Sequence, residues 1–281
     1  MAARAVVFGY GEIGVRCLGA LLDAGVDVPL VVTHRDDPAE RRWYASLFDF
    51  STERHLPVLA DPPLAEIEGQ LKNLRPDLIF SFYYRSMLPM PVLRTAKLGA
   101  YNMHGSLLPK YRGRAPLNWA ILHGEKETGV TLHAMVEKPD AGGIVDQEAV
   151  PIGPDETAVE VFRKMTEAAE TVLRRSLKKL ISGKIETRPN DTSKGSYFGR
   201  RTPEDGRIDW SKSALEIHNL VRAVAPPFPG AFAGSMKIYR TSLEENKQPP
   251  SKTLGPYREG ADWFAVCGDG KVLRLLEVEE A

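Results

Sequence analysis

The chain has few cysteines, no excess charge of either sign and no long apolar run. Only two of its 281 residues are cysteine, Cys17 and Cys267, so neither a disulfide framework nor a set of zinc ligands is visible. Lys plus Arg and Asp plus Glu number 37 each, which gives no global basic bias toward nucleic-acid phosphates. No apolar stretch approaches membrane-spanning length, and the first residues show no signal-peptide core. We therefore expect a cytoplasmic protein with no metal, no nucleic-acid partner and no membrane insertion.

Hydrophobic residues make up 43% of the chain, enough for a packed core. Strands are expected where apolar runs are short, and helices where apolar residues recur with helical spacing. The expected strands are Ala3 to Phe8, Val28 to Val32, Leu56 to Leu59 and Pro76 to Phe82; the expected helices are Val15 to Ala24, Arg41 to Glu53 and Pro63 to Leu74. This alternation predicts a Rossmann-like, mostly parallel α/β sheet with helices on both faces and ligands at the carboxyl ends of its strands.

The second half of the chain has a different pattern. A long amphipathic helix is expected from Asp155, as N-cap, to Ile181, with Gly183 as its stop. Polar and turn-forming residues from Thr187 to Gly195 then suggest a linker. Ser213-Ala-Leu-Glu216 is a capping-box pattern, and short strands with polar turns follow it. We predict a catalytic domain at 1–188, a linker at 189–202 and a small β-barrel domain at 203–281.

A glycine motif follows the first expected strand. Gly9 to Gly14 spells G-x-G-x-x-G, a pattern typical of dinucleotide binding when an acidic residue lies about 20 positions further on. Thr33 and His34 stand at the end of the second strand instead, and Asp36 and Asp37 come slightly late. We therefore favour a structural turn or a wall of the substrate cleft over an NAD site.

Polar residues gather between Asn102 and Asp140. Leu98 to Met103 is apolar enough for a buried strand, and Asn102 and His104, two residues apart, would project from one face. The segment Ser106 to Pro116 is expected to be a loop, because prolines and a glycine interrupt it. A further strand, Val130 to Val136, leads to Asp140. An amide, an imidazole and a carboxylate thus leave two strand ends that could be neighbours.

The wording of this stretch resembles a known family. N-M-H-G-S-L-L-P at 102–109, followed by D-A-G-G at 140–143, resembles the 10-formyltetrahydrofolate-dependent formyltransferases, which act on methionyl-tRNA, phosphoribosylglycinamide or nucleotide sugars. The run P-K-Y-R-G-R-A-P-L-N-W at 109–119 resembles the nucleotide-sugar branch, in particular the formyltransferase half of the bifunctional polymyxin-resistance enzymes that formylate UDP-4-amino-4-deoxy-L-arabinose. Further similar runs lie at 33–34, 81–85, 198–203 and 221–225. The resemblance implies 10-formyltetrahydrofolate as cosubstrate, no dinucleotide, and an OB-like C-terminal β-barrel.

Formyl transfer to an amine makes three demands that these residues can meet. The amine must lose a proton, an oxyanion needs stabilisation, and the leaving nitrogen needs a proton. Imidazole transfers protons near neutral pH, so we assign that role to His104. Asp140 would orient the ring and favour its protonated form, and Asn102 would donate an N–H to the oxyanion. Taken alone, His104 could be an ordinary core histidine, Asn102 an amide that binds backbone, and Asp140 a turn residue. Together, in the order that the family has them, the three residues indicate catalysis.

The resemblance also assigns binding residues. Cosubstrate contacts are implied for two backbone segments and one side chain: Ser86, Met87 and Leu88; Val136, Glu137, Lys138, Pro139 and Asp140; and Arg114. Arg200 and Arg201 suit nucleotide phosphates, although an ion pair between domains is an equal alternative. Tyr10, in the glycine turn, is expected to line the pocket for the amine substrate.

Several alternatives stay open at the level of sequence. Methionyl-tRNA formyltransferases usually carry a basic insertion after the second strand, whereas His34 to Glu40 is short and mixed in charge. Another UDP- or dTDP-amino sugar, a NAD-dependent oxidoreductase and a non-catalytic nucleotide-binding module are the others. The bifunctional enzymes continue into a dehydrogenase-decarboxylase half, whereas this sequence stops at Ala281. We therefore expect a stand-alone enzyme or a relative with a trimmed barrel. The sequence leaves a homo-oligomer open as one alternative.

Overall fold

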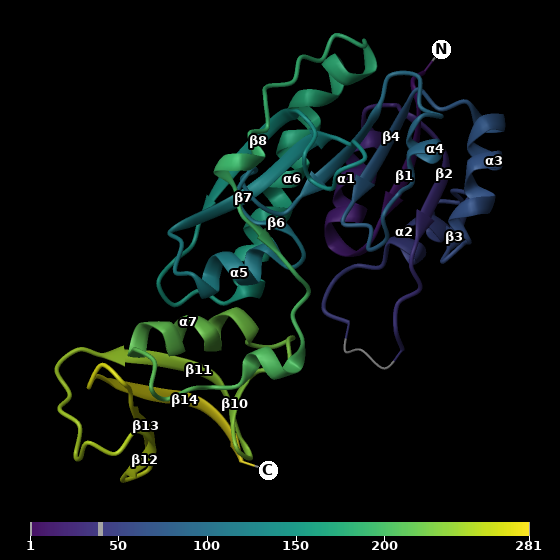
Figure 1. Ribbon diagram of the computed structural model, residues 1–281. Coiled ribbons are helices and arrows are strands. Elements are labelled where there is room, and N and C mark those ends of the chain that lie inside the picture. The colour runs from purple at the N-terminus through teal and green to yellow at the C-terminus, as the bar shows by residue number, and fades with distance from the viewer. Residues whose placement is uncertain (1, 39–41, 281) are drawn as a thin grey trace. The chain divides into compact units, whose positions relative to one another are not determined.

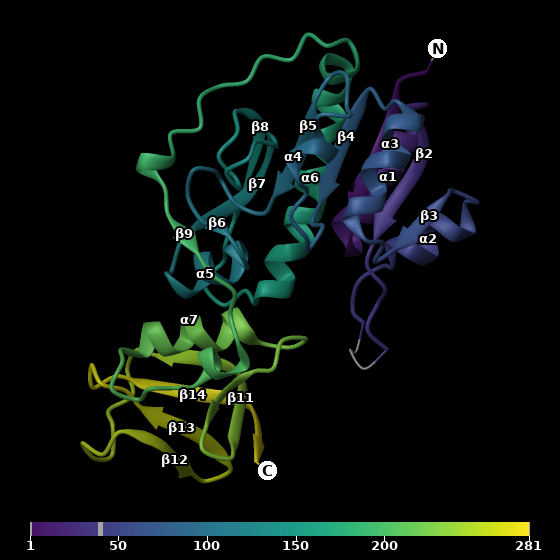
Figure 2. The same cartoon turned by 45° about the vertical axis from the view of Figure 1, so that its right-hand side comes forward.

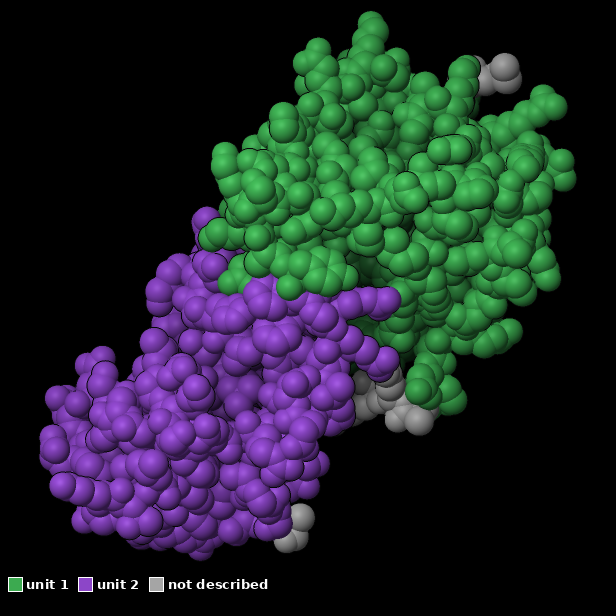
Figure 3. Space-filling view, viewed as in Figure 1, with its two compact units in different colours: residues 1–113, 129–150, 164–197 green, residues 114–128, 151–163, 198–281 purple. Residues whose placement is uncertain are grey.

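A computed structural model describes residues 2–38 and 42–280 of the protein. The chain forms two compact units, coloured separately in Figure 3. Unit 1 consists of residues 1–113, 129–150 and 164–197, and unit 2 of residues 114–128, 151–163 and 198–281. The domain boundaries at 188 and 203 stay a prediction. No helix in the described part of the chain is long and apolar enough to cross a membrane.

Unit 1 is built on a mixed sheet whose described strands run in the order β3-β2-β1-β4-β5-β7-β8 (Figure 1). Their bounds are β1 Arg4–Gly9, β2 Asp27–Thr33, β3 Val58–Ala60, β4 Leu78–Phe82, β5 Ala100–His104, β7 Glu127–Ala134 and β8 Ile144–Pro151. The pairs from β3 to β5 are parallel, whereas β5 and β7 are antiparallel. The chain order reverses between β1 and β4, which makes their carboxyl ends the usual place for a ligand.

Helices cover both faces of this sheet (Figure 2). They are α1 Gly11–Asp23, α2 Leu47–Glu53, α3 Leu64–Leu74, α4 Met90–Leu93 and α6 Ala158–Ile181. The crossovers through α1 and α3 run in opposite directions along the sheet, so right-handed connections place these helices on opposite faces. Val6 and Phe8 of β1 pack with Ile67 and Leu71 of α3 and with Val92 of α4. Ion pairs join α1 to α6, at Arg16–Glu170 and Arg174–Asp23.

The glycine motif after β1 forms the tight turn into α1. Gly11 adopts φ +60°, a conformation that glycine tolerates without strain. A Cβ at Gly9 would lie 2.8 Å from the Leu47 side chain, and one at Gly14 would lie 3.0 Å from it. Glycine at these two positions therefore makes room for α2 to pack against the turn.

Unit 2 contains α5 Pro116–Leu122, α7 Ala214–Val224 and an antiparallel sheet in the order β10-β11-β14-β13-β12. Its strands are β10 Ala231–Ala233, β11 Met236–Glu244, β12 Gly255–Glu259, β13 Asp262–Val266 and β14 Val272–Glu280. The predicted capping box is present, since Ser213 and Glu216 each accept from the other's backbone N–H. Arg222 of α7 is buried and donates to the carbonyls of Gly153 and Glu156.

The expected fold class is confirmed: a mostly parallel sheet with helices is followed by a small antiparallel β domain. Several local predictions are wrong. Helix α1 begins at Gly11 rather than Val15, α2 begins only at Leu47, and α6 begins at Ala158 rather than after Asp155; Arg41 lies outside the described residues. The expected loop from Ser106 to Pro116 contains a two-residue strand, β6 Arg112–Gly113, which pairs with β9 Tyr197–Phe198.

Candidate active site

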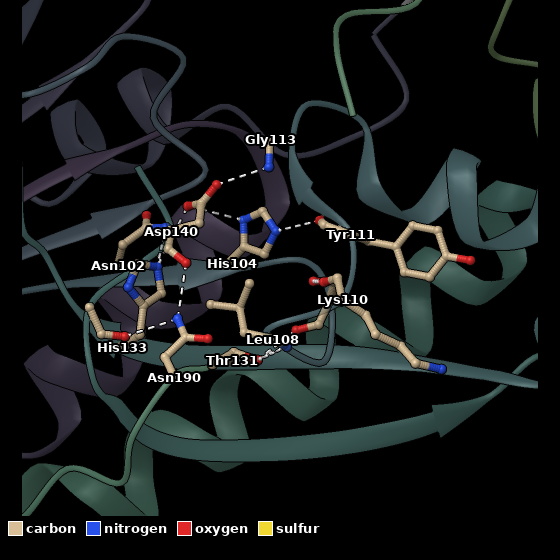
Figure 4. Close-up of polar contacts among 12 residues, drawn as sticks. Asn102, His104, Leu108, Lys110, Tyr111, Gly113, Thr131, His133, Asp140 and Asn190 are labelled. Atoms are coloured by element: carbon tan, nitrogen blue, oxygen red, sulfur yellow. Dashed lines mark hydrogen bonds and ion pairs between the residues drawn. The ribbon is translucent and has the colours of Figure 1, made fainter. Parts of the chain in front are cut away.

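Asn102 and His104 lie two residues apart on β5, as predicted, and the partner strand β7 adds a second histidine. Because β5 and β7 are antiparallel, Asn102 lies directly opposite His133, and His104 opposite Thr131. The end of β7 therefore lies beside the start of β5, and the expectation of two neighbouring strand ends is wrong. Asp140 reaches His104 because the segment between β7 and β8 returns toward the carboxyl end of β5 (Figure 4).

The ring of His104 is hydrogen-bonded at one nitrogen and faces a carboxylate with the other. Its Nε2 lies 2.9 Å from the carbonyl oxygen of Tyr111, and since a carbonyl only accepts, Nε2 carries a hydrogen. Nδ1 faces Oδ1 of Asp140 at 3.5 Å. The ring is only 7% exposed. With the hydrogen on Nε2, Nδ1 is the ring nitrogen that faces the Asp140 carboxylate.

Asp140 is held by two neighbouring residues, Gly113 and Asn190. It has φ +50°, an uncommon conformation for a residue with a side chain. Its Oδ2 accepts from the N–H of Gly113 at 3.0 Å. Asn190, from the segment predicted to be a linker, donates its amide to the carbonyls of Asp140 and Gly142, both at 3.0 Å (Figure 4). These contacts fix the carboxylate next to His104.

His133 determines which way the amide of Asn102 points. Nδ1 of His133 lies 2.9 Å from the carbonyl of Ala134, so Nδ1 carries the hydrogen. Burial, together with the neighbouring charge of His104, lowers the pKa of His133 to about 4, although the Ala134 and Asp140 contacts oppose this. The ring is therefore neutral at neutral pH, and Nε2 is a bare acceptor 3.1 Å from Asn102 Nδ2. Asn102 must then present its NH₂ group, one hydrogen bound to His133 and one available for a ligand.

The loop after β5 is fixed by polar contacts from β7 and β8. Thr131 Oγ1 donates to the carbonyl of Ser106 at 2.6 Å and accepts from the N–H of Leu108 at 3.1 Å. Gln147 donates to the carbonyl of Leu108 at 2.9 Å. Figure 4 shows this loop carrying the Tyr111 carbonyl to the His104 ring. The loop thus holds the anchored nitrogen of the catalytic candidate.

The family model described as formyl transferase matches residues 3–177, and the model for the formyl transferase C-terminal domain matches residues 200–281. The chain belongs to the formyl transferase family. It is accordingly a formyltransferase, and Asn102, His104 and Asp140 all lie within the region matched by the first model.

Solved structures of N-formyltransferases and of the protein HypX share the fold. An N-formyltransferase from Helicobacter canadensis, in complex with folinic acid and dTDP-3-aminofucose, is 24% identical, with a TM-score of 0.80 over 98% of this chain and 99% of that one. WlaRD, a sugar 3N-formyltransferase with dTDP and 5-N-formyl-THF, is 22% identical, with a TM-score of 0.77 over 98% of each chain. HypX from Aquifex aeolicus is 18% identical, with a TM-score of 0.68 over 98% of this chain and 45% of that one.

The two backbone segments assigned to the cosubstrate lie in unit 1, whereas Arg114, the side chain assigned with them, is exposed and belongs to unit 2. Ser86 and Met87 are exposed, while the Leu88 side chain packs into the core with α3 and α4. Val136, Glu137 and Lys138 are exposed, and Pro139 and Asp140 are half-buried. Both segments leave strands of the sheet, one after β4 and one after β7. Their roles stay predictions.

The residues assigned to the substrate are more dispersed. Tyr10 is 7% exposed; its hydroxyl lies 2.6 Å from that of Tyr44, and the Arg85 guanidinium lies 4.0 Å from its ring centre. Arg200 and Arg201 belong to unit 2. Arg201 lies 4.7 Å above the Trp119 ring and donates to the carbonyl of Asp205. Arg200 is exposed.

Proposed function

We propose that this formyltransferase transfers the formyl group of 10-formyltetrahydrofolate to the amine of a nucleotide-linked amino sugar. The observation that carries the proposal is the geometry around His104 Nδ1. That atom lies 3.5 Å from the Asp140 carboxylate, and the amide of Asn102 on the same strand is oriented to offer an N–H. A proton carrier, a carboxylate and an oxyanion donor are the groups that acyl transfer to an amine requires.

The reaction follows from these positions. The unprotonated amine attacks the formyl carbon, and the carbonyl electrons move to oxygen, where the free N–H of Asn102 and the protonated His104 stabilise the oxyanion. His104 Nδ1 then delivers its proton to N10 as the bond from carbon to N10 of the folate breaks. The neutral Nδ1 next takes the proton from the attacking nitrogen, so that the products are the formylated amine and tetrahydrofolate and the ring is protonated again. Asp140 stabilises the charged ring during the transfer.

The nature of the two substrates is supported by the relatives of similar fold. The H. canadensis enzyme holds folinic acid and a dTDP-amino sugar, and WlaRD holds dTDP and a formyl folate. For this chain we extend these ligand classes to a folate bound at Ser86–Leu88, Arg114 and Val136–Asp140, with Tyr10, Arg200 and Arg201 on the nucleotide sugar. The run at 109–119 favours UDP-4-amino-4-deoxy-L-arabinose, the sugar of lipid A modification in polymyxin resistance.

The test is release of tetrahydrofolate from 10-formyltetrahydrofolate with three acceptors in parallel. These are UDP-4-amino-4-deoxy-L-arabinose, a dTDP-amino sugar and charged initiator methionyl-tRNA. Turnover with the UDP-sugar supports the full proposal, and turnover with the dTDP-sugar alone supports the class but corrects the sugar. Turnover with the tRNA alone, or with none of the three, contradicts the assignment to nucleotide sugars.

A further inference from the structure

His34, at the end of β2, joins two other strand ends of unit 1. Its Nδ1 lies 2.6 Å from Oδ1 of Asp61, which follows β3. Its Nε2 accepts the backbone N–H of Arg85, which follows β4, at 3.2 Å. The imidazole is 13% exposed. One ring therefore ties together segments that leave three different strands.

These two contacts require one protonation state. A backbone N–H is always a donor, so Nε2 of His34 must be a bare acceptor. Asp61 accepts a hydrogen from Nδ1; burial opposes its charge, but bonds from the Arg35 N–H and His34 lower the pKa of Asp61 below its usual value. The ring is thus the neutral tautomer with hydrogen on Nδ1. A second proton on Nε2 would remove the acceptor for Arg85.

Among the described residues, the contacts of the segment that begins at Arg85 lie mainly at its two ends. The His34 ring stacks on Tyr84, with ring centres 4.3 Å apart, and the Arg85 guanidinium lies over Tyr10. Ser86 is exposed and the Met87 side chain is 56% exposed, whereas Leu88 is 5% exposed in the core. The backbone of Ser86 and Met87 is therefore held at one end by the hydrogen bond between His34 and Arg85 and at the other end by the buried Leu88 side chain.

We propose that His34 is a positioning residue that holds the Arg85–Leu88 backbone in shape for the cosubstrate only while its ring is neutral. The link to the cosubstrate rests on the proposed function, because Ser86 to Leu88 is assigned to the folate there. Protonation of His34 releases the Arg85 N–H and loosens this backbone. The other charged or titratable groups near the ring also follow the ends of strands β1 to β4. They are Asp61, Tyr10, Tyr84, Arg85, Arg35 and Asp36.

Hydrogen exchange at the Arg85 amide, measured by NMR without any substrate, tests the contact directly. The protection factor of this amide is compared between about pH 8 and pH 5. In the wild-type protein it falls toward low pH. In His34→Gln, whose side-chain oxygen can accept the N–H but does not titrate, protection is retained across the range. In His34→Leu it is lost at every pH, by about tenfold.

Kinetics then test the link to the cosubstrate. The KM for 10-formyltetrahydrofolate is expected to rise about fivefold in His34→Leu, with kcat little changed, and to stay near normal in His34→Gln. The exposed His55, replaced in His55→Asn, is the matched control.

The outcomes separate the two proposals. Unchanged Arg85 protection in His34→Leu, or equal losses in both variants, overturns the role of His34. Lost protection with an unchanged KM overturns its link to the cosubstrate. If His34→Leu does not fold, the pH comparison between the wild-type protein and His34→Gln decides. Absence of turnover with any acceptor would refute the proposed function alone, since exchange needs no activity.

Discussion

The side chains of Asn102 and His133 meet across two antiparallel strands, with Asn102 Nδ2 3.1 Å from His133 Nε2. His133 is held as a neutral acceptor by the carbonyl of Ala134 and by its own burial. The amide of Asn102 therefore has a single orientation, with one N–H left for the oxyanion that we propose it stabilises. An amide that was free to flip would offer its oxygen half of the time and repel that charge.

Replacing the acceptor should lower the rate rather than the affinity. In His133→Leu the amide of Asn102 loses its fixed orientation, and we expect kcat to fall by roughly 10²-fold, as for removal of an oxyanion donor. KM for both substrates should change little. Steady-state kinetics beside the exposed His55→Asn control checks this, and an unaltered kcat would show that Asn102 needs no such support.

Burial of His133 also makes stability depend on pH. Its pKa in the folded protein, about 4, lies below the ordinary histidine value of 6.5. Below pH 6.5 His133 binds a proton in the unfolded chain but stays neutral in the folded protein. Stability is therefore lost as pH falls toward 4. The contribution is about 3 kcal/mol at most. Urea unfolding at pH 7 and pH 5 should show a smaller difference for His133→Gln than for the wild-type protein; equal differences would refute this account.

Asn190 should matter for the position of Asp140. Its amide donates to the carbonyls of Asp140 and Gly142, and its loss in Asn190→Ala removes two part-buried hydrogen bonds, worth about 1–3 kcal/mol of stability. The carboxylate then moves more freely, so kcat should fall as well. Thermal unfolding and turnover are compared with Asn246→Ala, at an exposed position. A variant indistinguishable from that control would mean that Asp140 is held without Asn190.

Gly142 should tolerate no side chain. A Cβ there would lie 1.8 Å from the carbonyl oxygen of Ala134, so Gly142→Ala must displace the segment that carries Asp140, at a cost of about 1–3 kcal/mol. Gly69, in the middle of α3, has open space at its Cβ position. Gly69→Ala should instead stabilise the protein by about 0.5–1 kcal/mol. In denaturant unfolding, the free energy of unfolding should fall in Gly142→Ala and rise in Gly69→Ala. A change of the same sign in both variants would contradict this explanation.

The sequence was informative where chemistry and local pattern coincide. Asn102 and His104 could be paired because residues two apart on a strand share a face. The capping box at Ser213 and the stop at Gly183, which has φ +67°, follow from local rules as well. The alternation of strands and helices gave the parallel sheet.

What it missed depends on contacts between distant segments. His133 stands opposite Asn102 only through the antiparallel register of β5 and β7, which the local pattern does not specify. Asn190 lies in a stretch whose Pro, Asn, Asp and Ser content is typical of a linker, yet it clamps the Asp140 segment. Strand β8 was missed because Asp146, Gln147 and Glu148 interrupt its apolar residues. In β7 the polar residues Thr131 and His133 alternate with apolar residues. This alternation was the hint in the sequence that His133 shares a face with other polar residues.

The most direct test of the account is the rate of tetrahydrofolate release by His104→Ala beside the wild-type protein, with 10-formyltetrahydrofolate and a nucleotide-linked amino sugar. If His104 Nδ1 carries the proton between amine and folate, the variant should lose on the order of 10²–10⁴-fold in kcat while remaining folded. Turnover close to that of the wild-type protein would contradict the central role given to His104 and, with it, the mechanism built on Asn102 and Asp140.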